Sequence, residues 1–368
     1  MGLADYISDL KSELRAEDES LVTLHPTDVE IYDIFSGGGL PRGGFVEFVG
    51  NPGAGKTTLA LQILGQVQKT QDCIISIIDA ERSITAKRLQ AFGLDPNKVI
   101  LVQRGITVEK IFDDRIQKIV AYKEKKKIKD LPVYILWDSI AHTPAEKELE
   151  VTDLNQAIGV KAKVLNNLLR KYDEMLLEYN ITIIAINQLT SKVGMGNMYV
   201  KQVQINGLGD RTVPGGTGQY FVAFHFLALD KKSDLSGSEF GFKGAIVQGK
   251  FLKNKAAVPF EDFYMVLDFK KGFNMFWTKF IYLKEAKIIK VNGGWYTLEG
   301  YTDESGKLKK FRGSSSLEKY NTDPKFKEAF DKYWNVLADE LKKALSDEEK
   351  IEELNKQAEG NIGELDKE

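Results

Sequence analysis

The chain of 368 residues has little of several residue types, and each shortage excludes a class of protein. It holds one cysteine, Cys73, so an internal disulfide framework is excluded. With only three scattered histidines, the sequence also argues against a structural zinc site. No apolar run approaches the roughly 20 residues of a transmembrane helix, and the first residues lack the apolar segment of a secretory signal. We therefore expect a cytoplasmic protein with no membrane partner.

Basic and acidic residues are nearly balanced, since 51 basic and 53 acidic residues give a net charge of −2. Overall charge therefore does not indicate a nucleic-acid partner, which would have to be bound by local basic patches. The charge is nevertheless uneven along the chain. From Ser346 onward nine acidic residues stand against three lysines, so the rest of the chain is mildly basic. This acidic end is predicted to be disordered.

Short apolar runs alternate with helical patterns in the first half of the chain. Runs rich in valine, isoleucine and aromatic residues predict strands over 45–49, 73–78, 133–137 and 181–186. The spacing of apolar residues between them predicts helices over 58–69, 106–124 and 156–179. This alternation predicts an α/β fold with a mainly parallel central sheet that helices cover on both faces.

The flanking segments predict additions to this core. Helical spacing predicts a short amphipathic helix over 3–17 and a longer one over 324–344. Three strand-like segments, 219–229, 242–253 and 258–268, are spaced like an antiparallel extension of the sheet. We expect four parts: an N-terminal helix and linker (1–30), the core (31–270), a small α+β C-terminal domain (271–345) and an acidic tail (346–368).

A phosphate-binding loop follows the first predicted core strand. Residues 50–57 read GNPGAGKT, a complete GxxxxGK[ST] loop between a strand and a helix. Glycines let backbone N–H groups converge on phosphate oxygens, and the helix amino end adds partial positive charge. Lys56 would reach the β and γ phosphates, and Thr57 would place its hydroxyl on Mg²⁺. The predicted nucleotide-binding residues of this loop are Gly50, Asn51, Pro52, Gly53, Ala54, Gly55, Lys56, Thr57 and Thr58.

Polar residues at the ends of three other predicted strands narrow the chemistry. Asp138 ends the strand 133–137 and would hold Mg²⁺, although an aspartate there is often simply a helix cap. Glu81 lies just beyond the strand 73–78, where a carboxylate can polarise an attacking water. Gln188 follows the strand 181–186, where an amide can sense the γ-phosphate. Each of the last two could also be an ordinary loop residue.

From about residue 34 to 268 these motifs, in this order, resemble those of the RecA family of recombinases. The segments that carry the resemblance are 36–43, 50–57, 79–81, 138–139, 187–188 and 253–260. In the C-terminal region, Gly294-Trp295-Tyr296 and the following segment 303–306 resemble the UvsX branch of phage recombinases. The resemblance implies a RecA-like P-loop core with ATP and Mg²⁺ as cofactors, in the cytoplasm of a bacterium or of a phage-infected cell.

The resemblance also implies an activity and partners. ATP would drive filament formation on single-stranded DNA, and the filament would pair with homologous double-stranded DNA and exchange strands. Subunits would join through the N-terminal linker, where Val22 or Leu24 could dock on the neighbour. A loader or mediator and a single-strand-binding protein are the further partners it points to.

The resemblance also implies roles for individual residues. Glu81 corresponds to the catalytic base and Gln188 to the glutamine that switches with nucleotide state. Lys253 and Lys255 correspond to two cations that reach the ATP of the neighbouring subunit, although they could be two solvated lysines on a strand edge. Arg88 stands where a tyrosine often stacks on adenine, and a guanidinium can stack on a purine as well.

Two DNA-binding loops are implied at about 146–160 and 189–217, the second of them rich in glycine. Spaced cations suit a phosphate backbone, and apolar tips such as Ile158 and Val193 could wedge between bases. The alternative is a surface loop of ordinary charge. Binding should not depend on sequence. The expected DNA contacts are Ile158, Gly159, Lys161, Lys163, Arg170, Lys192, Val193, Gly194, Tyr199, Lys201, Arg211, Gly215 and Gly216.

Two rival functions stay open at this point. The first is a hexameric DNA helicase with the same core fold. The recombinase is favoured over it by the segments 253–260 and 159–163. The second is a catalytically silent, ATP-binding mediator that assists another recombinase. Intact Glu81, Gln188 and Lys56 argue against that second function.

Overall fold

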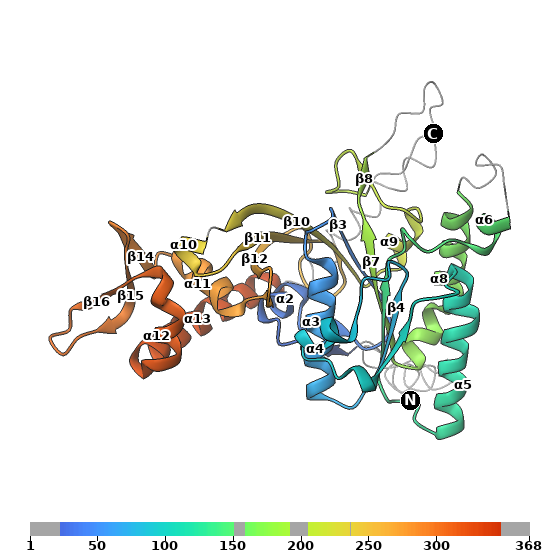
Figure 1. Ribbon diagram of the computed structural model, residues 1–368, viewed down its shortest axis with the longest axis horizontal. Coiled ribbons are helices and arrows are strands. Elements are labelled where there is room, and N and C mark those ends of the chain that lie inside the picture. Colours follow the sequence, from blue (N-terminus) through green and yellow to red (C-terminus); the bar gives the residue numbers. More distant parts are fainter. Residues whose placement is uncertain (1–22, 151–158, 192–204, 236, 347–368) are drawn as a thin grey trace, which may run out of the picture.

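The computed structural model describes residues 23–150, 159–191, 205–235 and 237–346 (Figure 1). The helix expected over 3–17, the residue Val22 and the acidic tail from 347 lie outside the described residues. Among the described helices, none has the length and apolar character that crossing a membrane requires.

A nine-stranded sheet in the order β13-β12-β11-β10-β3-β7-β6-β4-β5 forms the centre of the molecule. Six strands run parallel to one another: β3 (Gly44–Gly50), β4 (Ile74–Asp79), β5 (Val99–Val102), β6 (Val133–Asp138), β7 (Ile181–Gln188) and β10 (His225–Leu235). Three more extend the sheet antiparallel: β11 (Gly244–Asn254), β12 (Asp262–Asp268) and β13 (Gly272–Phe273). The predicted α/β fold with a mainly parallel sheet is confirmed.

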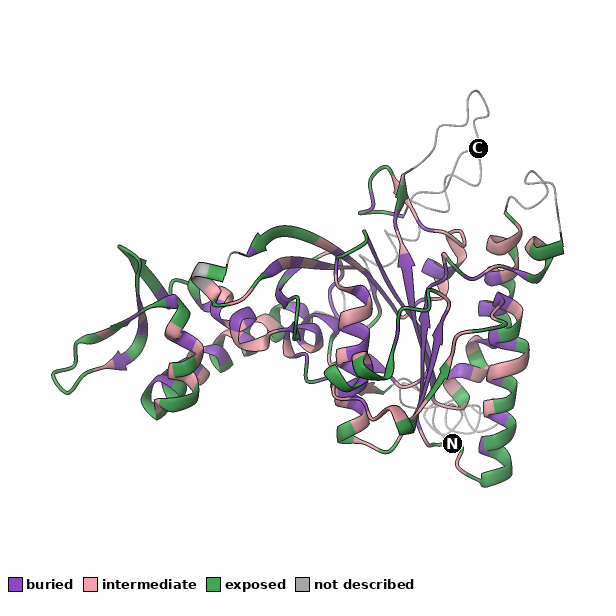
Figure 2. Cartoon of the chain, in the orientation of Figure 1, coloured by how far each residue is buried: buried purple, intermediate pink, exposed green. Residues whose placement is uncertain are grey.

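Helices cover both faces of the parallel part, which is why its strands are apolar on both sides. Val46 and Phe48 of β3 belong to one apolar cluster, together with α3 (Lys56–Thr70) and α2 (Glu30–Ser36). Phe45 and Val49 of the same strand point to the opposite cluster, with α5 (Gln117–Lys126) and α8 (Val160–Glu178). Figure 2 shows the central strands buried along their length.

The structure differs from the expected elements at several places. The strand expected over 219–229 begins only at His225, because residues 218–222 form the helix α9 (Gly218–Val222). Tyr220 there is buried, and its hydroxyl donates to the Leu252 carbonyl oxygen at 3.0 Å. This tertiary contact outweighs the strand propensity of the aromatic run. Within the helix expected over 106–124, the turns at Lys110–Ile116 are π-helical and precede α5.

Short elements without a clear period escaped prediction. They include the edge strand β5, the helices α4 (Ala86–Ala91) and α6 (Glu146–Glu150), and two small ladders. The ladders join β1 (Leu24–His25) to β2 (Leu40–Pro41) and β8 (Thr190–Ser191) to β9 (Arg211–Thr212). The second ladder pairs two ends of the glycine-rich segment expected to lack regular structure.

The C-terminal region lies at the end of the molecule opposite α5 and α8 (Figure 1). It consists of α11 (Met275–Glu285), a three-stranded sheet of β14 (Ile289–Asn292), β15 (Trp295–Thr302) and β16 (Leu308–Phe311), then α12 (Ser316–Thr322) and α13 (Pro324–Leu345). Asp323 caps α13, accepting from two backbone N–H groups. Trp334 of α13 donates to Glu30 of α2 at 2.6 Å, which ties this region to the core.

Candidate functional site

The loop between β3 and α3 has the backbone that phosphate binding requires. Gly55 has φ of +87°, and a Cβ there would lie 2.8 Å from the ring of Phe273. A Cβ on Gly50 would lie 2.2 Å from the Leu229 carbonyl oxygen, so both positions exclude larger residues. No described side chain caps the amino end of α3. Its first N–H groups are therefore available to an anion.

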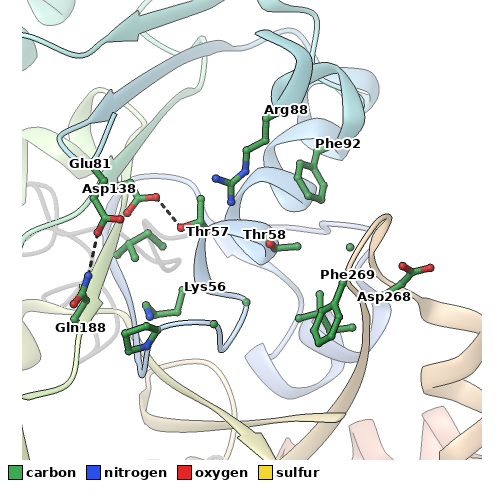
Figure 3. Close-up of a pocket in the computed structure, with 16 residues that line it drawn as sticks. Lys56, Thr57, Thr58, Glu81, Arg88, Phe92, Asp138, Gln188, Asp268 and Phe269 are labelled. Atoms are coloured by element: carbon green, nitrogen blue, oxygen red, sulfur yellow. Dashed lines mark hydrogen bonds between the residues drawn. The ribbon is translucent and has the colours of Figure 1, made fainter. Parts of the chain in front are cut away.

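A cavity of about 380 Å³ opens at this loop, at the carboxyl edge of the parallel strands (Figure 3). Ten predicted site residues line it: Pro52, Gly53, Gly55, Lys56, Thr57, Thr58, Glu81, Arg88, Asp138 and Gln188. Gly50, Asn51 and Ala54 belong to the loop without lining the cavity. The segments that supply these residues are far apart in sequence, and the sheet order brings them together.

Lys56 is 7% exposed and is held by its own loop. Its ammonium donates to the carbonyl oxygens of Gly50 at 2.8 Å and Asn51 at 2.9 Å. Burial lowers the pKa of Lys56, while the nearby carboxylates of Asp138 and Glu81 raise it. The ammonium therefore lies at the phosphate loop with partners that an incoming phosphate can replace.

Asp138 and Thr57 form the part of the cavity that fits a divalent cation. Thr57 Oγ1 donates to Asp138 Oδ2 at 2.7 Å, whereas Asp138 Oδ1 is buried without a hydrogen-bond partner among the described residues. Burial raises the pKa of Asp138 to about 6, against the hydrogen bond from Thr57. A buried unpaired carboxylate oxygen beside a hydroxyl is the kind of oxygen donor set that Mg²⁺ takes.

Glu81 lies where three polar side chains converge on one carboxylate oxygen. Its Oε1 accepts from Gln188 Nε2 at 3.2 Å and from Ser139 Oγ at 2.9 Å, and His142 Nδ1 lies 3.0 Å away. Asp79 at the end of β4 holds the turn that presents Glu81, accepting backbone N–H groups of the residues just after it. Sequence reasoning missed His142, because a single histidine after a strand carries no spacing signal.

The far end of the cavity has room and side chains for a planar base. Arg88 of α4 lies there with Phe92, and the end of β12 and the turn after it contribute Asp268 and Phe269 (Figure 3). Phe269 is 55% exposed, which is unusual for so large an apolar side chain, and the Lys231 ammonium lies over its ring at 5.7 Å from the centroid. No sequence motif pointed to Phe92, Asp268 or Phe269, since only the fold places them beside the phosphate loop.

A buried network links the phosphate-loop strand to the second predicted DNA loop. Asn187 Nδ2 donates to Glu47 Oε1 of β3 at 2.9 Å and to the Pro214 carbonyl oxygen at 2.8 Å. Burial raises the pKa of Glu47 to about 8, against the hydrogen bond from Asn187. Glu47 therefore keeps its proton in the folded protein at neutral pH.

This proton makes folding stability depend on pH. Between the usual pKa of 4.5 and about 8 the folded chain holds a proton that the unfolded chain releases. The free energy of unfolding should therefore fall as pH rises through this window, by at most about 1.4 kcal/mol per pH unit from this group. We expect Glu47→Gln to remove that slope, measured by denaturant unfolding at several pH values. Equal slopes in both proteins would contradict the assignment.

Lys253 and Lys255 do not line the cavity of their own chain. Lys253 is 1% exposed and its ammonium donates to the Phe221 carbonyl oxygen at 2.6 Å, whereas Lys255 is exposed. The alternative of two solvated lysines is therefore wrong for Lys253, because its side chain lies over the Tyr220 ring in the interior. Any nucleotide that Lys255 contacts must belong to another subunit or require a rearrangement.

Most of the expected DNA contacts that the structure describes lie on α8 or pack against it. Gly159 precedes this helix, and Lys161, Lys163 and Arg170 lie on it. A Cβ on Gly215 would lie 2.9 Å from Leu165, and one on Gly216 would lie 2.9 Å from Ala162. These two glycines therefore allow close packing of the second segment on α8, and Arg211 lies nearby in sequence on β9. Ile158, Lys192, Val193, Gly194, Tyr199 and Lys201 lie outside the described residues.

The fold and the cavity define the chain as a P-loop ATPase with a recombinase-type core. The family model of the RecA N-terminal domain matches residues 12–274. The RecA protein of Mesomycoplasma hyopneumoniae is 32% identical over 305 residues, which cover 79% of this chain and 83% of the relative. That of Malacoplasma penetrans is 30% identical over 320 residues, covering 87% of this chain and 85% of the relative.

The chain belongs to the RecA family. It is accordingly an ATP-dependent recombinase, that is, a DNA-dependent ATPase with strand-exchange activity that uses ATP with Mg²⁺. As in its family, it binds DNA and forms filaments. Neither the helicase nor the silent mediator is favoured by these relatives.

Proposed function

We propose that this recombinase hydrolyses ATP at the cavity between β3 and α3, with Glu81 as the general base, and uses hydrolysis to release DNA. The observation that carries the proposal is the position of Glu81, next to Lys56 and Asp138 and in contact with Gln188. ATP then acts mainly as a switch of DNA affinity. The test is strand exchange between circular single-stranded and linear double-stranded DNA, which should require ATP.

Each side chain in the cavity has a separate task. Lys56 exchanges the two loop carbonyls for the β and γ phosphates, and Thr57 and Asp138 hold Mg²⁺. When bound, Mg²⁺ supplies positive charge against the phosphate oxygens. Glu81 accepts a proton from the attacking water through the carboxylate oxygen that Gln188 does not contact. Arg88 stacks on the adenine across from Phe269.

Assembly completes the site in this proposal. Lys255, just after β11, reaches the nucleotide of the neighbouring subunit. The buried Lys253 stabilises the carboxyl end of β11 through its hydrogen bond to the Phe221 carbonyl oxygen. Among the described strands β5 pairs with β4 alone, and its side chains Ile100 and Leu101 are 54% and 37% exposed. An edge of this kind accepts a further strand, and the linker within residues 1–30 of a neighbour is our candidate. Electron microscopy should show helical filaments, and closed rings would favour a helicase.

The helix α8 supplies cations for DNA in our proposal. Lys163 and Arg170 are exposed, while Lys161 donates to the Ala141 carbonyl oxygen at 3.1 Å. Our proposal adds as further DNA contacts Arg211, Gly215 and Gly216, together with Lys192, Val193, Gly194 and Lys201, which lie outside the described residues. These contacts involve backbone phosphates and stacked bases, so they carry no base preference.

Replacing Lys163 by alanine should remove about one phosphate contact. Binding to single-stranded DNA should weaken, and the slope of log affinity against log salt should flatten by roughly one unit. The matched control is Lys118→Ala, which removes an exposed lysine that pairs with Asp114 instead. Its salt slope should equal that of the wild type. Three identical slopes would remove Lys163 from the DNA site.

The branch of the RecA family to which the protein belongs is also a proposal. Gly294-Trp295-Tyr296 and the segment 303–306 support the UvsX branch of phage recombinases, and with it the cytoplasm of a phage-infected or bacterial cell. A loader or mediator and a single-strand-binding protein are the partners such a recombinase would need. We also propose the division of the chain that the sequence pattern predicts. It has a linker within 1–30, a core to about 270, a C-terminal domain to 345 and an acidic tail. Limited proteolysis should cut near these boundaries.

A further inference from the structure

His142 contacts the carboxylate of Glu81 although it belongs to none of the motifs that led to the site. Its Nδ1 lies 3.0 Å from Glu81 Oε1 and 2.9 Å from Ser139 Oγ. Ser139 Oγ in turn lies 2.9 Å from the same Oε1. The imidazole, the hydroxyl and the carboxylate therefore meet in one small triangle.

The triangle decides where the protons lie. An ionised carboxylate can only accept, and Ser139 has a single hydroxyl proton, which it donates to Glu81. A proton on Nδ1 fits this arrangement, because two lone pairs would otherwise face each other at 3.0 Å. Gln188 and Ser139 donate to Oε1, His142 Nδ1 lies 3.0 Å from the same oxygen, and no described residue donates to Oε2. The lone pairs of Oε2 stay available to a water proton.

The backbone that carries His142 is itself fastened on two sides. The Ala141 carbonyl oxygen accepts from Lys161 of α8 at 3.1 Å. Thr143 is fully buried, and its hydroxyl donates to the Ser139 carbonyl oxygen at 2.9 Å. The imidazole between these anchors is half exposed, with a side-chain exposure of 50%, so it contributes little to core packing. Its polar contacts are those with Glu81 and Ser139.

We propose that His142 is a positioning residue for ATP hydrolysis, which orients the Glu81 carboxylate by donating from Nδ1 to Oε1. This inference rests on the proposed role of Glu81 as the general base. Without the donor the carboxylate can rotate, and the oxygen that faces the water is no longer defined. The loss should appear in kcat and not in KM for ATP, because His142 does not line the nucleotide cavity.

Two variants separate the donor from the bulk of the side chain. His142→Asn keeps an N–H donor near the position of Nδ1, and His142→Leu keeps similar bulk without any donor. In DNA-stimulated ATP hydrolysis by the full chain, His142→Leu should lower kcat by about 10-fold, since small misplacements of a reacting group are costly. KM for ATP should be unchanged, and His142→Asn should restore most of kcat. Wild-type kcat in His142→Leu, or equal losses in both variants, would overturn the proposal.

The same assay on a Glu81→Gln background tests whether His142 acts through Glu81. There His142→Leu should lower kcat no further, because the group that it orients is already gone. A further fall would show that His142 acts by another route and would overturn the proposal. If Glu81→Gln alone keeps normal turnover, the proposed role of Glu81 fails. If Glu81→Gln is impaired and His142→Leu is not, only the role of His142 fails.

Discussion

Glu81→Gln should reduce DNA-stimulated ATP turnover by about 10²-fold or more, since a general base typically contributes 10²–10⁴-fold. Gln has nearly the same shape, and its amide oxygen can still accept from Ser139 and Gln188, so the cavity should persist. It cannot, however, take a proton from water. The measurement is steady-state hydrolysis with saturating single-stranded DNA.

Binding of ATP should survive this change. In our proposal Lys56, Thr57 and Asp138 hold the phosphates and the metal, and none of them donates to Glu81. Equilibrium binding of a fluorescent ATP analogue should therefore match the wild type, and filaments on single-stranded DNA should persist because release needs hydrolysis. Turnover close to that of the wild type would exclude Glu81 as the base. Loss of nucleotide binding would instead indicate a damaged cavity.

Lys255→Ala should abolish DNA-stimulated hydrolysis while leaving the nucleotide affinity of the isolated chain unchanged. The exposed Lys255 does not line its own cavity, so in our proposal it neutralises γ-phosphate charge across a subunit boundary. Lys253 makes a less clean test. Its removal would leave the Phe221 carbonyl oxygen without this donor, at a cost of about 1–3 kcal/mol in folding stability.

Mixed filaments give a direct test of action across the boundary. Lys56→Ala disables a chain's own cavity but keeps its Lys255, and Lys255→Ala does the reverse. Each protein alone should be inactive. A mixture should recover part of the hydrolysis, because some interfaces then combine an intact cavity with an intact Lys255. If the two proteins assemble together on DNA and recover nothing, Lys255 acts within its own chain.

The two ends of the cavity differ in how many of their residues the sequence predicts. At the phosphate end, Lys56, Thr57 and Asp138 were predicted, because the loop and the strand ends are local patterns that parallel strands carry to one edge. At the base end, Phe92, Asp268 and Phe269 were not predicted. They come from two segments about 175 positions apart, and neither segment carries a pattern that predicts its contact with the other.

The same contrast applies to the secondary structure. The strands β3, β4, β6 and β7 were predicted to within two residues at either end, because strands buried on both faces are continuous apolar runs. The helix α9 was taken for a strand, since its aromatic run has strand propensity. Only the hydrogen bond from Tyr220 to the strand β11 makes the helical path favourable.

The sequence by itself determined the parallel α/β core, the phosphate loop and the side chains of Thr57 and Asp138 beside it, because these depend on residue type at short, fixed spacing. The tertiary structure decided the burial of Lys253, the protonation of Glu47 and the contact of His142 with Glu81. Each of these depends on which distant backbone or side-chain atoms surround a group. A sequence pattern carries no such information, since burial and hydrogen bonding are properties of packed neighbours.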